Sequence, residues 1–148
     1  ATFGAGCFWH VEDLLSKTKG VTSTAVGYIG GQLPNPTYEE VCSAQTGHAE
    51  AVEVEFNPDE ITYEALLDIF WRNHNPTTLN RQGPDVGNQY RSAIFYHDEV
   101  QKEIAEKSKQ SLDSSKSFND PIVTQIIPAP KFYKAEEYHQ KYFKKQGF

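Results

Sequence analysis

The first chemically distinctive residue of the chain is Cys7, which stands between a short strand-like opening and an expected helix. Residues 2–5 lead into Gly6, and residues 11–15 have the apolar spacing of a helix. Cys7 is therefore predicted at a helix N-terminus, where unpaired backbone N–H groups and the helix dipole favour a thiolate. Cysteines in such positions can have pKa values lowered to roughly 3.5–7.5, and the thiolate is the reactive form. We interpret Cys7 as a nucleophile; the alternative is a cysteine that packs as a small apolar residue.

A second candidate is Glu50, a carboxylic acid within an alternating segment. Residues 49–56 alternate as a β-strand does, so Glu50 shares a face with Val52 and Val54. Burial on that face would raise the pKa of Glu50, which keeps the acid protonated and able to donate near neutral pH. The alternative is that Glu50, close to the end of the strand, turns out to solvent, because carboxylates are rarely buried completely.

Further polar candidates lie at the ends of loops. Tyr38 follows a turn-forming Asn-Pro-Thr sequence, and Tyr90 closes a long segment, residues 75–89, that has little periodicity and several Pro and Gly residues. Long ordered loops in compact domains are usually functional. Taken by themselves, the tyrosines are typical surface anchors and Asp85 is a typical turn former.

Together these residue types match one kind of chemistry, attack on a polar S=O group. A sulfoxide oxygen leaves only after protonation, so the reaction needs an acid and hydrogen-bond donors. Glu50 and the phenols could supply these groups. The S-methyl group of a sulfoxide prefers an apolar aromatic contact, and Phe8 and Trp9 lie directly beside Cys7 in the sequence.

The elements that must position these residues alternate between strands and helices. Strand-like segments occupy residues 2–5, 21–28, 49–56, 92–96 and 122–127, and helical patterns occupy residues 7–19, 37–42, 63–74, 98–112 and 135–145. This order predicts an α+β fold with a small, mostly antiparallel sheet and helices packed on it.

Length and composition restrict the possible classes of protein. With 148 residues, we expect a single catalytic domain over residues 1–148. The net charge of −6, without a Lys/Arg cluster, argues against a nucleic-acid partner. The sequence has two cysteines, no Cys-x-x-Cys or His-x-x-x-His spacing, and no apolar run of membrane-spanning length. We therefore expect a cytoplasmic monomer without a metal site or a disulfide scaffold.

The motifs of the chain, taken together, resemble the peptide methionine sulfoxide reductase A family. The similar motifs run in the same order through nearly the whole chain: Gly6-Cys7-Phe8-Trp9, Gly27-Tyr28-Ile29-Gly30-Gly31, Asn35-Pro36-Thr37-Tyr38, Val41-Cys42-Ser43, Thr46-Gly47-His48-Ala49-Glu50, Gly83-Pro84-Asp85-Val86-Gly87-Asn88-Gln89-Tyr90-Arg91 and Ala135-Glu136-Glu137-Tyr138-His139-Gln140-Lys141-Tyr142. Each motif is weak by itself, but the set is highly specific.

The resemblance implies a fold and a reaction. The fold would be a two-layer α+β sandwich related to the ferredoxin-like class. The reaction would be reduction of the S epimer of methionine sulfoxide, free or in proteins. The resemblance assigns Cys7 as the nucleophile and Glu50 as the acid that protonates the sulfoxide oxygen. It further assigns Tyr38 and Tyr90 as phenols that donate hydrogen bonds to the sulfoxide oxygen. Phe8 and Trp9 would form the wall that receives the S-methyl group, and Asp85 would order the pocket.

The sequence departs from the family in its cysteines. The resemblance implies that the reaction leaves the nucleophilic cysteine as a sulfenic acid. In many members, further cysteines in a C-terminal tail convert this sulfenic acid to a disulfide, whereas residues 144–148 contain no cysteine. Cys42 does not match the usual resolving position, and we interpret it as a buried small residue beside Val41. We therefore expect no Cys7–Cys42 disulfide. A one-cysteine cycle would follow, with no cofactor, in which glutaredoxin, thioredoxin or glutathione reduces the sulfenic acid directly.

Two alternative functions stay open at this level. A cysteine hydrolase would need a histidine base beside Cys7, and none of the histidines stands in a recognisable signature. A non-enzymatic redox sensor or sulfoxide-peptide binding module would use Cys7 and the aromatic residues alone. Such a module would not need an acid on an apolar strand face, as Glu50 is expected to be, or the phenols of Tyr38 and Tyr90 beside it. Multiple turnover, as opposed to stoichiometric oxidation, would distinguish an enzyme from a sensor.

Overall fold

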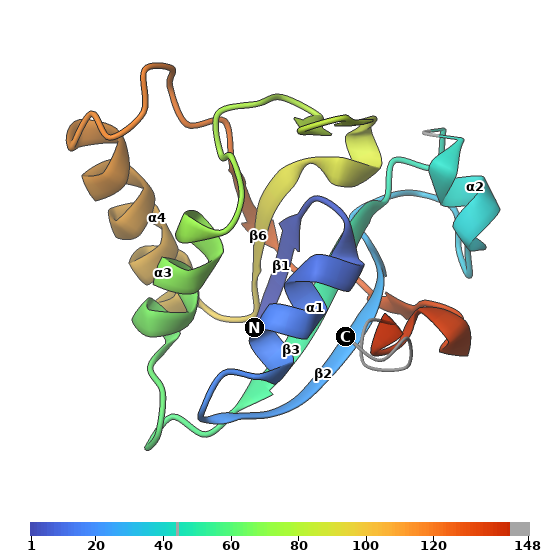
Figure 1. Cartoon of the computed structure of the whole chain (residues 1–148), viewed down its shortest axis with the longest axis horizontal. Helices are drawn as coiled ribbons and strands as arrows, with labels where there is room; N and C mark the ends of the chain where they lie inside the picture. The colour runs from blue at the N-terminus through green and yellow to red at the C-terminus, as the bar shows by residue number, and fades with distance from the viewer. Residues whose placement is uncertain (44, 143–148) are drawn as a thin grey trace.

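The computed structural model describes residues 1–43 and 45–142, and over these residues the strands form a six-stranded sheet and a separate two-stranded ribbon (Figure 1). The six strands run in the order β7-β6-β1-β3-β2-β8. Their bounds are Thr2–Ala5 for β1, Val21–Ile29 for β2, Ala49–Phe56 for β3, Ser92–Tyr96 for β6, Gln125–Pro128 for β7 and Tyr133–Lys134 for β8. Neighbouring strands pair antiparallel, apart from β6 and β7, which are parallel. The predicted mostly antiparallel α+β architecture is confirmed.

The helices begin where side chains can cap them. Their bounds are Phe8–Ser16 for α1, Tyr38–Cys42 for α2, Tyr63–Arg72 for α3 and Glu99–Ser114 for α4. Thr62 accepts a hydrogen bond from the backbone of α3, and Asp98 does the same for α4. Thr37 and Glu40 form a reciprocal capping box at α2. These caps explain why the sequence predicted the starts of these helices to within a residue.

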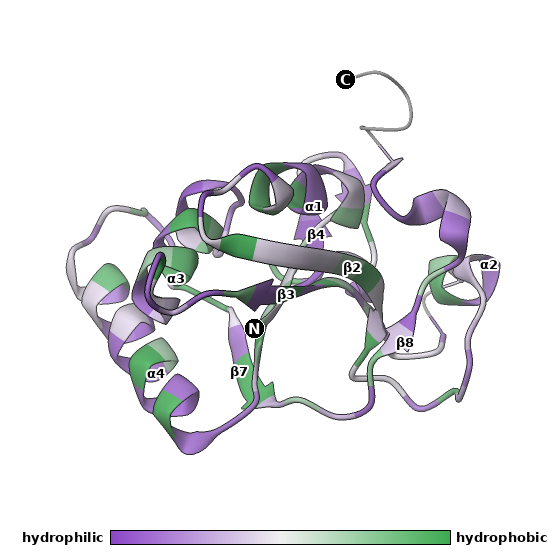
Figure 2. Ribbon diagram, turned by 90° about the horizontal axis from the view of Figure 1, so that it is seen from below, coloured by the Kyte–Doolittle hydropathy of each residue, from purple (hydrophilic) through white to green (hydrophobic). Residues whose placement is uncertain are grey.

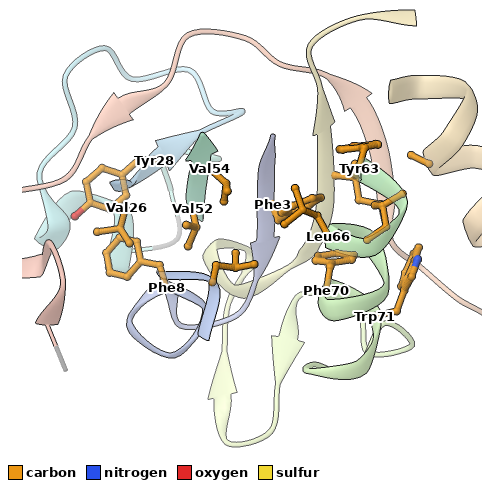
Figure 3. Close-up of a cluster of buried hydrophobic side chains, with 14 of the residues drawn as sticks. Phe3, Phe8, Val26, Tyr28, Val52, Val54, Tyr63, Leu66, Phe70 and Trp71 are labelled. Atoms are coloured by element: carbon orange, nitrogen blue, oxygen red, sulfur yellow. The ribbon is translucent and has the colours of Figure 1, made fainter. Parts of the chain in front are cut away.

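The two faces of the sheet are covered differently. In Figure 2, α1 lies on one side of β2 and β3, and the segment from β7 to β8 passes on the other side. The helix-covered face holds the larger core (Figure 3), in which Phe3 of β1 stacks on Phe70 of α3 with ring centroids 5.2 Å apart. The opposite face holds small residues such as Ala49 and Ala51 of β3. The alternation of β3 thus directs Glu50 toward the helix-covered face, as predicted.

The C-terminal part of the chain differs from the prediction. The segment predicted as a helix over residues 135–145 forms a 3₁₀ turn, η2, at Glu137–His139, while residues 143–145 lie outside the described part. The last predicted strand, residues 122–127, is shifted to Gln125–Pro128, and the short strand β8 was not predicted. Within residues 75–89 the structure adds the two-stranded ribbon and a 3₁₀ turn: β4 Arg81–Gln82, β5 Asp85–Val86 and η1 Asn88–Tyr90.

Buried polar contacts explain why the C-terminal segment departs from a helix. The Gln140 side chain accepts from the Val26 amide and donates to the Val26 carbonyl. The Lys141 amide donates to Glu12 of α1, and Glu136 accepts from the Tyr28 hydroxyl. Each of these bonds joins residues more than a hundred positions apart, so tertiary contacts override the local helical pattern.

His74, just after α3, links the fold to pH. Its Nδ1 donates to the Phe70 carbonyl at 2.6 Å, and its Nε2 is 2.6 Å from the Ser92 hydroxyl. Burial lowers the pKa of His74 to about 4, below its ordinary value near 6.5. Between these values the unfolded chain binds more protons at this histidine than the folded protein does. The stability linked to neutral His74 is therefore fully present above about pH 6.5 and is lost as the pH drops toward 4.

We therefore expect protonation of His74 to lower the free energy of unfolding by about 3 kcal/mol as the pH falls from 6.5 to 4. His74→Gln should flatten this dependence in urea unfolding measured across that range. His10→Gln, at an exposed position of α1, is the matched control. An equal pH slope in the unsubstituted protein and His74→Gln would contradict the assignment.

Candidate functional site

Cys7 lies at the turn between β1 and α1. Gly6 has φ +90°, a backbone conformation that side chains disfavour, and a Cβ there would lie 2.8 Å from Cγ of Gln82. This turn makes Cys7 the N-cap residue of α1, and its side chain is half-buried. The predicted placement at a helix N-terminus is confirmed.

The expected lowering of the Cys7 pKa is wrong for the resting protein. Burial raises the pKa of Cys7 to about 11, and the charges of Glu50 and Asp85 add to the rise. The backbone amides of Trp9 and His10 act in the predicted direction and lower it, but they do not compensate for lost hydration. Cys7 is therefore a neutral thiol at rest, because desolvation outweighs the helix N-terminus.

Glu50 is the buried acid that the alternation predicted. Its side chain is 1% exposed, and its Oε1 accepts a hydrogen bond of 3.3 Å from the Phe8 amide in the first turn of α1. Burial raises the pKa of Glu50 to about 8, so the carboxyl group is mainly protonated at neutral pH. Within the described part of the chain, its buried Oε2 has no hydrogen-bond partner. The alternative that Glu50 turns out to solvent is therefore wrong.

Tyr38 and Tyr90 reach the surroundings of Glu50 from two different segments. Tyr38 begins α2 and Tyr90 ends η1, and the charge of Glu50 contributes to a raised pKa at both phenols. Burial is the main cause, and it raises the pKa of Tyr90 to about 12. Cys7 also acts on Tyr90. The structure thus brings both phenols, in their proton-donating form, close enough to Glu50 for its charge to act on them, and Tyr90 close enough to Cys7 as well.

Phe8 and Trp9 differ in how they border this site. Phe8 is 1% exposed, and its ring stacks with Tyr38 at a centroid separation of 6.4 Å. Trp9 is half-buried and stacks on Tyr142 with centroids 3.9 Å apart. Phe8 is therefore enclosed by its neighbours, whereas Trp9 stays partly accessible to solvent.

Asp85 reaches the site from the ribbon of β4 and β5. It is half-buried on β5, and its charge raises the pKa of Cys7, Glu50 and Tyr90. Asp85 and Cys7 also line one cavity. Asp85 is therefore more than a turn former.

His139 was not among the predicted site residues. It is 1% exposed, its Nδ1 accepts a hydrogen bond of 3.0 Å from the Trp9 indole, and its ring lies 4.3 Å from that of Tyr38. Glu136, which accepts from the Tyr38 amide, holds the same segment in place. The Glu-Glu-Tyr-His-Gln sequence is part of a family motif, but a polar helix over this segment gives no reason to expect His139 beside Trp9.

Cys42 is exposed at the end of α2, which contradicts its interpretation as a buried residue. Its neighbour Val41 is fully buried instead, because a short helix can direct only some of its positions inward. Burial raises the pKa of Cys42, and a hydrogen bond with the Tyr38 side chain acts in the opposite direction. Cys42 therefore borders the candidate site without belonging to the core.

Two negative findings concern residues 1–43 and 45–142. No three His, Cys, Asp or Glu side chains of this part are grouped so that they could hold a metal ion. No helix in it combines the length and apolar character needed to cross a bilayer.

The chain is similar to known proteins over nearly its whole length. A family model described as peptide methionine sulfoxide reductase matches residues 1–147. A peptide methionine sulfoxide reductase MsrA of Methanothermobacter thermautotrophicus is 63% identical over 145 residues, which cover 98% of this chain and 86% of the relative. The MsrA of Methanosarcina acetivorans is 59% identical over 148 residues, covering 100% of this chain and 79% of the relative.

The structural comparison agrees. The crystal structure of Mxr1 from Saccharomyces cerevisiae in reduced form matches with a TM-score of 0.92 and 38% identity, covering 99% of this chain and 84% of the yeast chain. The match includes the sheet and the helices that position Cys7 and Glu50, since almost the whole chain is covered. From its sequence and its fold, this chain belongs to the oxidoreductase family of peptide methionine sulfoxide reductases.

Proposed function

We propose that this chain reduces the S epimer of methionine sulfoxide, free or within polypeptides, to methionine. The observation that carries the proposal is Glu50. It is a completely buried acid with a raised pKa and one unpartnered oxygen, and the Phe8 amide next to Cys7 holds its other oxygen. A protonated carboxyl group in this position suits a leaving oxygen that must be protonated.

The proposed first half-reaction moves one oxygen atom. Glu50 donates its proton to the sulfoxide oxygen while the Cys7 sulfur attacks the substrate sulfur, and the thiol proton passes to the Glu50 carboxylate. The hydroxyl group then moves from the substrate sulfur to the Cys7 sulfur, so that the substrate S–O bond and the new S–S bond both break as a Cys7 S–O bond forms. Methionine leaves with two more electrons than the sulfoxide had, and Cys7 is left oxidised as a sulfenic acid.

The protonated form of Glu50 also makes it easier for Cys7 to lose its proton. The charge of Glu50 is one of the causes that raise the pKa of Cys7, and a protonated Glu50 carries no charge. Cys7 then has the backbone amides of Trp9 and His10 to favour its negative charge as its proton leaves. A neutral Glu50 thus serves both as proton donor and as the state in which Cys7 ionises more readily.

The remaining site residues have supporting roles in the proposal. The hydroxyl groups of Tyr38 and Tyr90 would donate hydrogen bonds to the sulfoxide oxygen as negative charge develops on it. Phe8 and Trp9 would contact the S-methyl group, because a methyl group next to a polarised sulfur prefers an aromatic surface. Asp85 would order the pocket from the side of the ribbon.

The second half-reaction requires an external thiol. One thiol attacks the Cys7 sulfenic acid, water leaves, and a mixed disulfide forms; a second thiol then releases Cys7 and carries away the disulfide. Thioredoxin, glutaredoxin and glutathione all provide this chemistry. No metal or prosthetic group takes part in either step.

A redox sensor is less well supported than an enzyme. Sensor cysteines react with oxidants because they are thiolates of low pKa, whereas burial raises the pKa of Cys7 to about 11. Such a thiol reacts efficiently only with a substrate that enters the site and meets Glu50.

The test is multiple-turnover reduction of the two resolved epimers of methionine sulfoxide with dithiothreitol as the reductant. We expect many turnovers with the S epimer and none with the R epimer. Turnover of both epimers would contradict the proposed specificity. Failure of the folded protein to turn over either epimer would contradict the proposal as a whole and leave the sensor or binding module as the better explanation.

A further inference from the structure

A cavity of about 320 Å³ lies on the helix-covered side of the sheet, between α1, α3 and the ribbon of β4 and β5. Figure 1 shows α3 beside α1 and the ribbon beyond the end of α3. The cavity floor is apolar and includes Phe3, Leu15 and Phe70, which are all buried. Val11 of α1 and Ile69 of α3 form opposite walls and are half-buried.

This cavity meets the candidate site at Cys7. It shares Cys7 and Asp85 with that site, and the rest of its lining comes from other residues. Phe8 of α1 bonds Glu50 of β3 through its backbone amide, and neither of these two residues lines the cavity. A substrate sulfur bound at Cys7 therefore has a second, separate apolar space beside it.

The edge of the cavity is polar. Asn73, at the end of α3, and His10 are exposed, and Gln82 and Asp85 contribute amide and carboxylate groups from the ribbon. An apolar space with a few polar groups at its edge is typical of binding sites, and a volume above roughly 300 Å³ is large enough for a ligand group. The Asp85 carboxylate at this edge could accept a hydrogen bond from a peptide N–H group, whereas the Gln82 amide already bonds Asn75.

Two exposed apolar side chains lie in the ribbon and just before it. Leu79 and Val86 are each 72% exposed, and Val86 directly follows Asp85. A free amino acid bound at Cys7 has no second side chain to place in the cavity that Cys7 lines. A polypeptide has such side chains close by, because successive Cα atoms lie about 3.8 Å apart.

We propose that the cavity between α1 and α3 is a binding site for an apolar side chain of a polypeptide substrate, within two positions of its methionine sulfoxide. This inference rests on the proposed function and extends it from the sulfoxide to the surrounding sequence. It makes polypeptides with Leu, Ile or Phe near the oxidised methionine better substrates than free methionine sulfoxide.

The experiment measures kcat/KM with dithiothreitol for blocked pentapeptides that carry S-methionine sulfoxide at the centre. One series has only Gly neighbours, and the others place Leu at each position within two residues of the centre. We expect Leu at one or two of these positions to raise kcat/KM by about tenfold over Gly. N-acetyl methionine sulfoxide amide, which has no neighbouring side chains, serves as the minimal substrate.

Two variants test the location. Val11→Phe fills the cavity and should reduce the Leu-to-Gly ratio toward one, whereas Val100→Phe, the same change at an exposed position of α4, should leave the ratio as in the unsubstituted protein. Leu14→Ala enlarges the cavity and should shift the preference from Leu to Phe. This second variant keeps the test open if Val11→Phe folds poorly.

The outcomes separate this inference from the proposed function. Turnover of the minimal substrate with equal kcat/KM for all peptides would overturn the binding site and leave the reductase function intact. A Leu preference that persists in both cavity variants would also overturn it. If Val11→Phe instead slowed recycling by thioredoxin without changing the Leu-to-Gly ratio, the cavity would receive the reductant, and the inference would be wrong. Only failure to turn over the minimal substrate would count against the proposed function.

Discussion

Replacement of Cys7 by serine is expected to lower kcat for S-methionine sulfoxide by more than about 10³-fold. A serine hydroxyl at the start of α1 would have the same backbone amides around it, but oxygen is a far poorer nucleophile toward sulfur and cannot accept the sulfoxide oxygen as a sulfenic acid. The measurement is steady-state turnover with dithiothreitol, together with a circular dichroism spectrum to establish that the variant folds. Residual activity within tenfold of the unsubstituted protein would exclude Cys7 as the nucleophile.

Cys42→Ser is the matched control, because it removes the chain's other thiol from an exposed position. We expect it to retain turnover within a few-fold. Mass spectrometry of the unsubstituted protein after one exposure to sulfoxide, without reductant, should show Cys7 as a sulfenic acid and no Cys7–Cys42 disulfide. Such a disulfide, together with loss of turnover in Cys42→Ser, would replace the one-cysteine cycle by an intramolecular one.

Glu50→Gln is expected to lower kcat by about 10²–10⁴-fold, the usual contribution of a general acid. The amide has the size of the acid, and its oxygen can still accept the hydrogen bond from Phe8. It cannot deliver a proton to the sulfoxide oxygen. Because the acid must be protonated to act, kcat of the unsubstituted protein should fall as the pH rises through about 8, where Glu50 ionises. Glu50→Gln should lose this fall.

Glu53→Gln provides the control for Glu50→Gln, since it makes the same change on the same strand but on the opposite face. Its turnover and pH profile should match those of the unsubstituted protein. If Glu50→Gln kept full turnover, or if its kcat declined above pH 8 as before, the proton would have to come from another group, and the phenols of Tyr38 and Tyr90 would be the next candidates.

Local patterns predicted the elements that carry the reacting groups. The strands at residues 49–56 and 92–96 have the predicted bounds, because alternation and Pro, Asn and Gly signals at their ends are properties of short segments. The same alternation predicted that Glu50 lies on the apolar face of its strand, and the structure decided that this position is buried. The start of α1 beside Cys7 follows in the same way from one glycine and a helical spacing.

Segments held by distant partners were predicted less well. The helix expected after residue 135 is replaced by η2 because Gln140 and Glu136 bond to β2 and α2, which the local sequence does not indicate. The same contacts place His139 against Trp9. The expected burial of Cys42 is wrong for a related reason, since only the packing of α2 decides which of two adjacent residues faces inward.

The sequence by itself determined which groups this protein can use for chemistry and which elements carry them: a thiol at a helix start, a carboxyl group on an apolar strand face, and phenols at loop ends. Only the tertiary structure decided their protonation states and surroundings. A pKa depends on how much water the folded chain removes from a group, and that is set by segments far away in the sequence. For Cys7 this desolvation reverses the effect of the helix N-terminus, and for Glu50 it produces the acid.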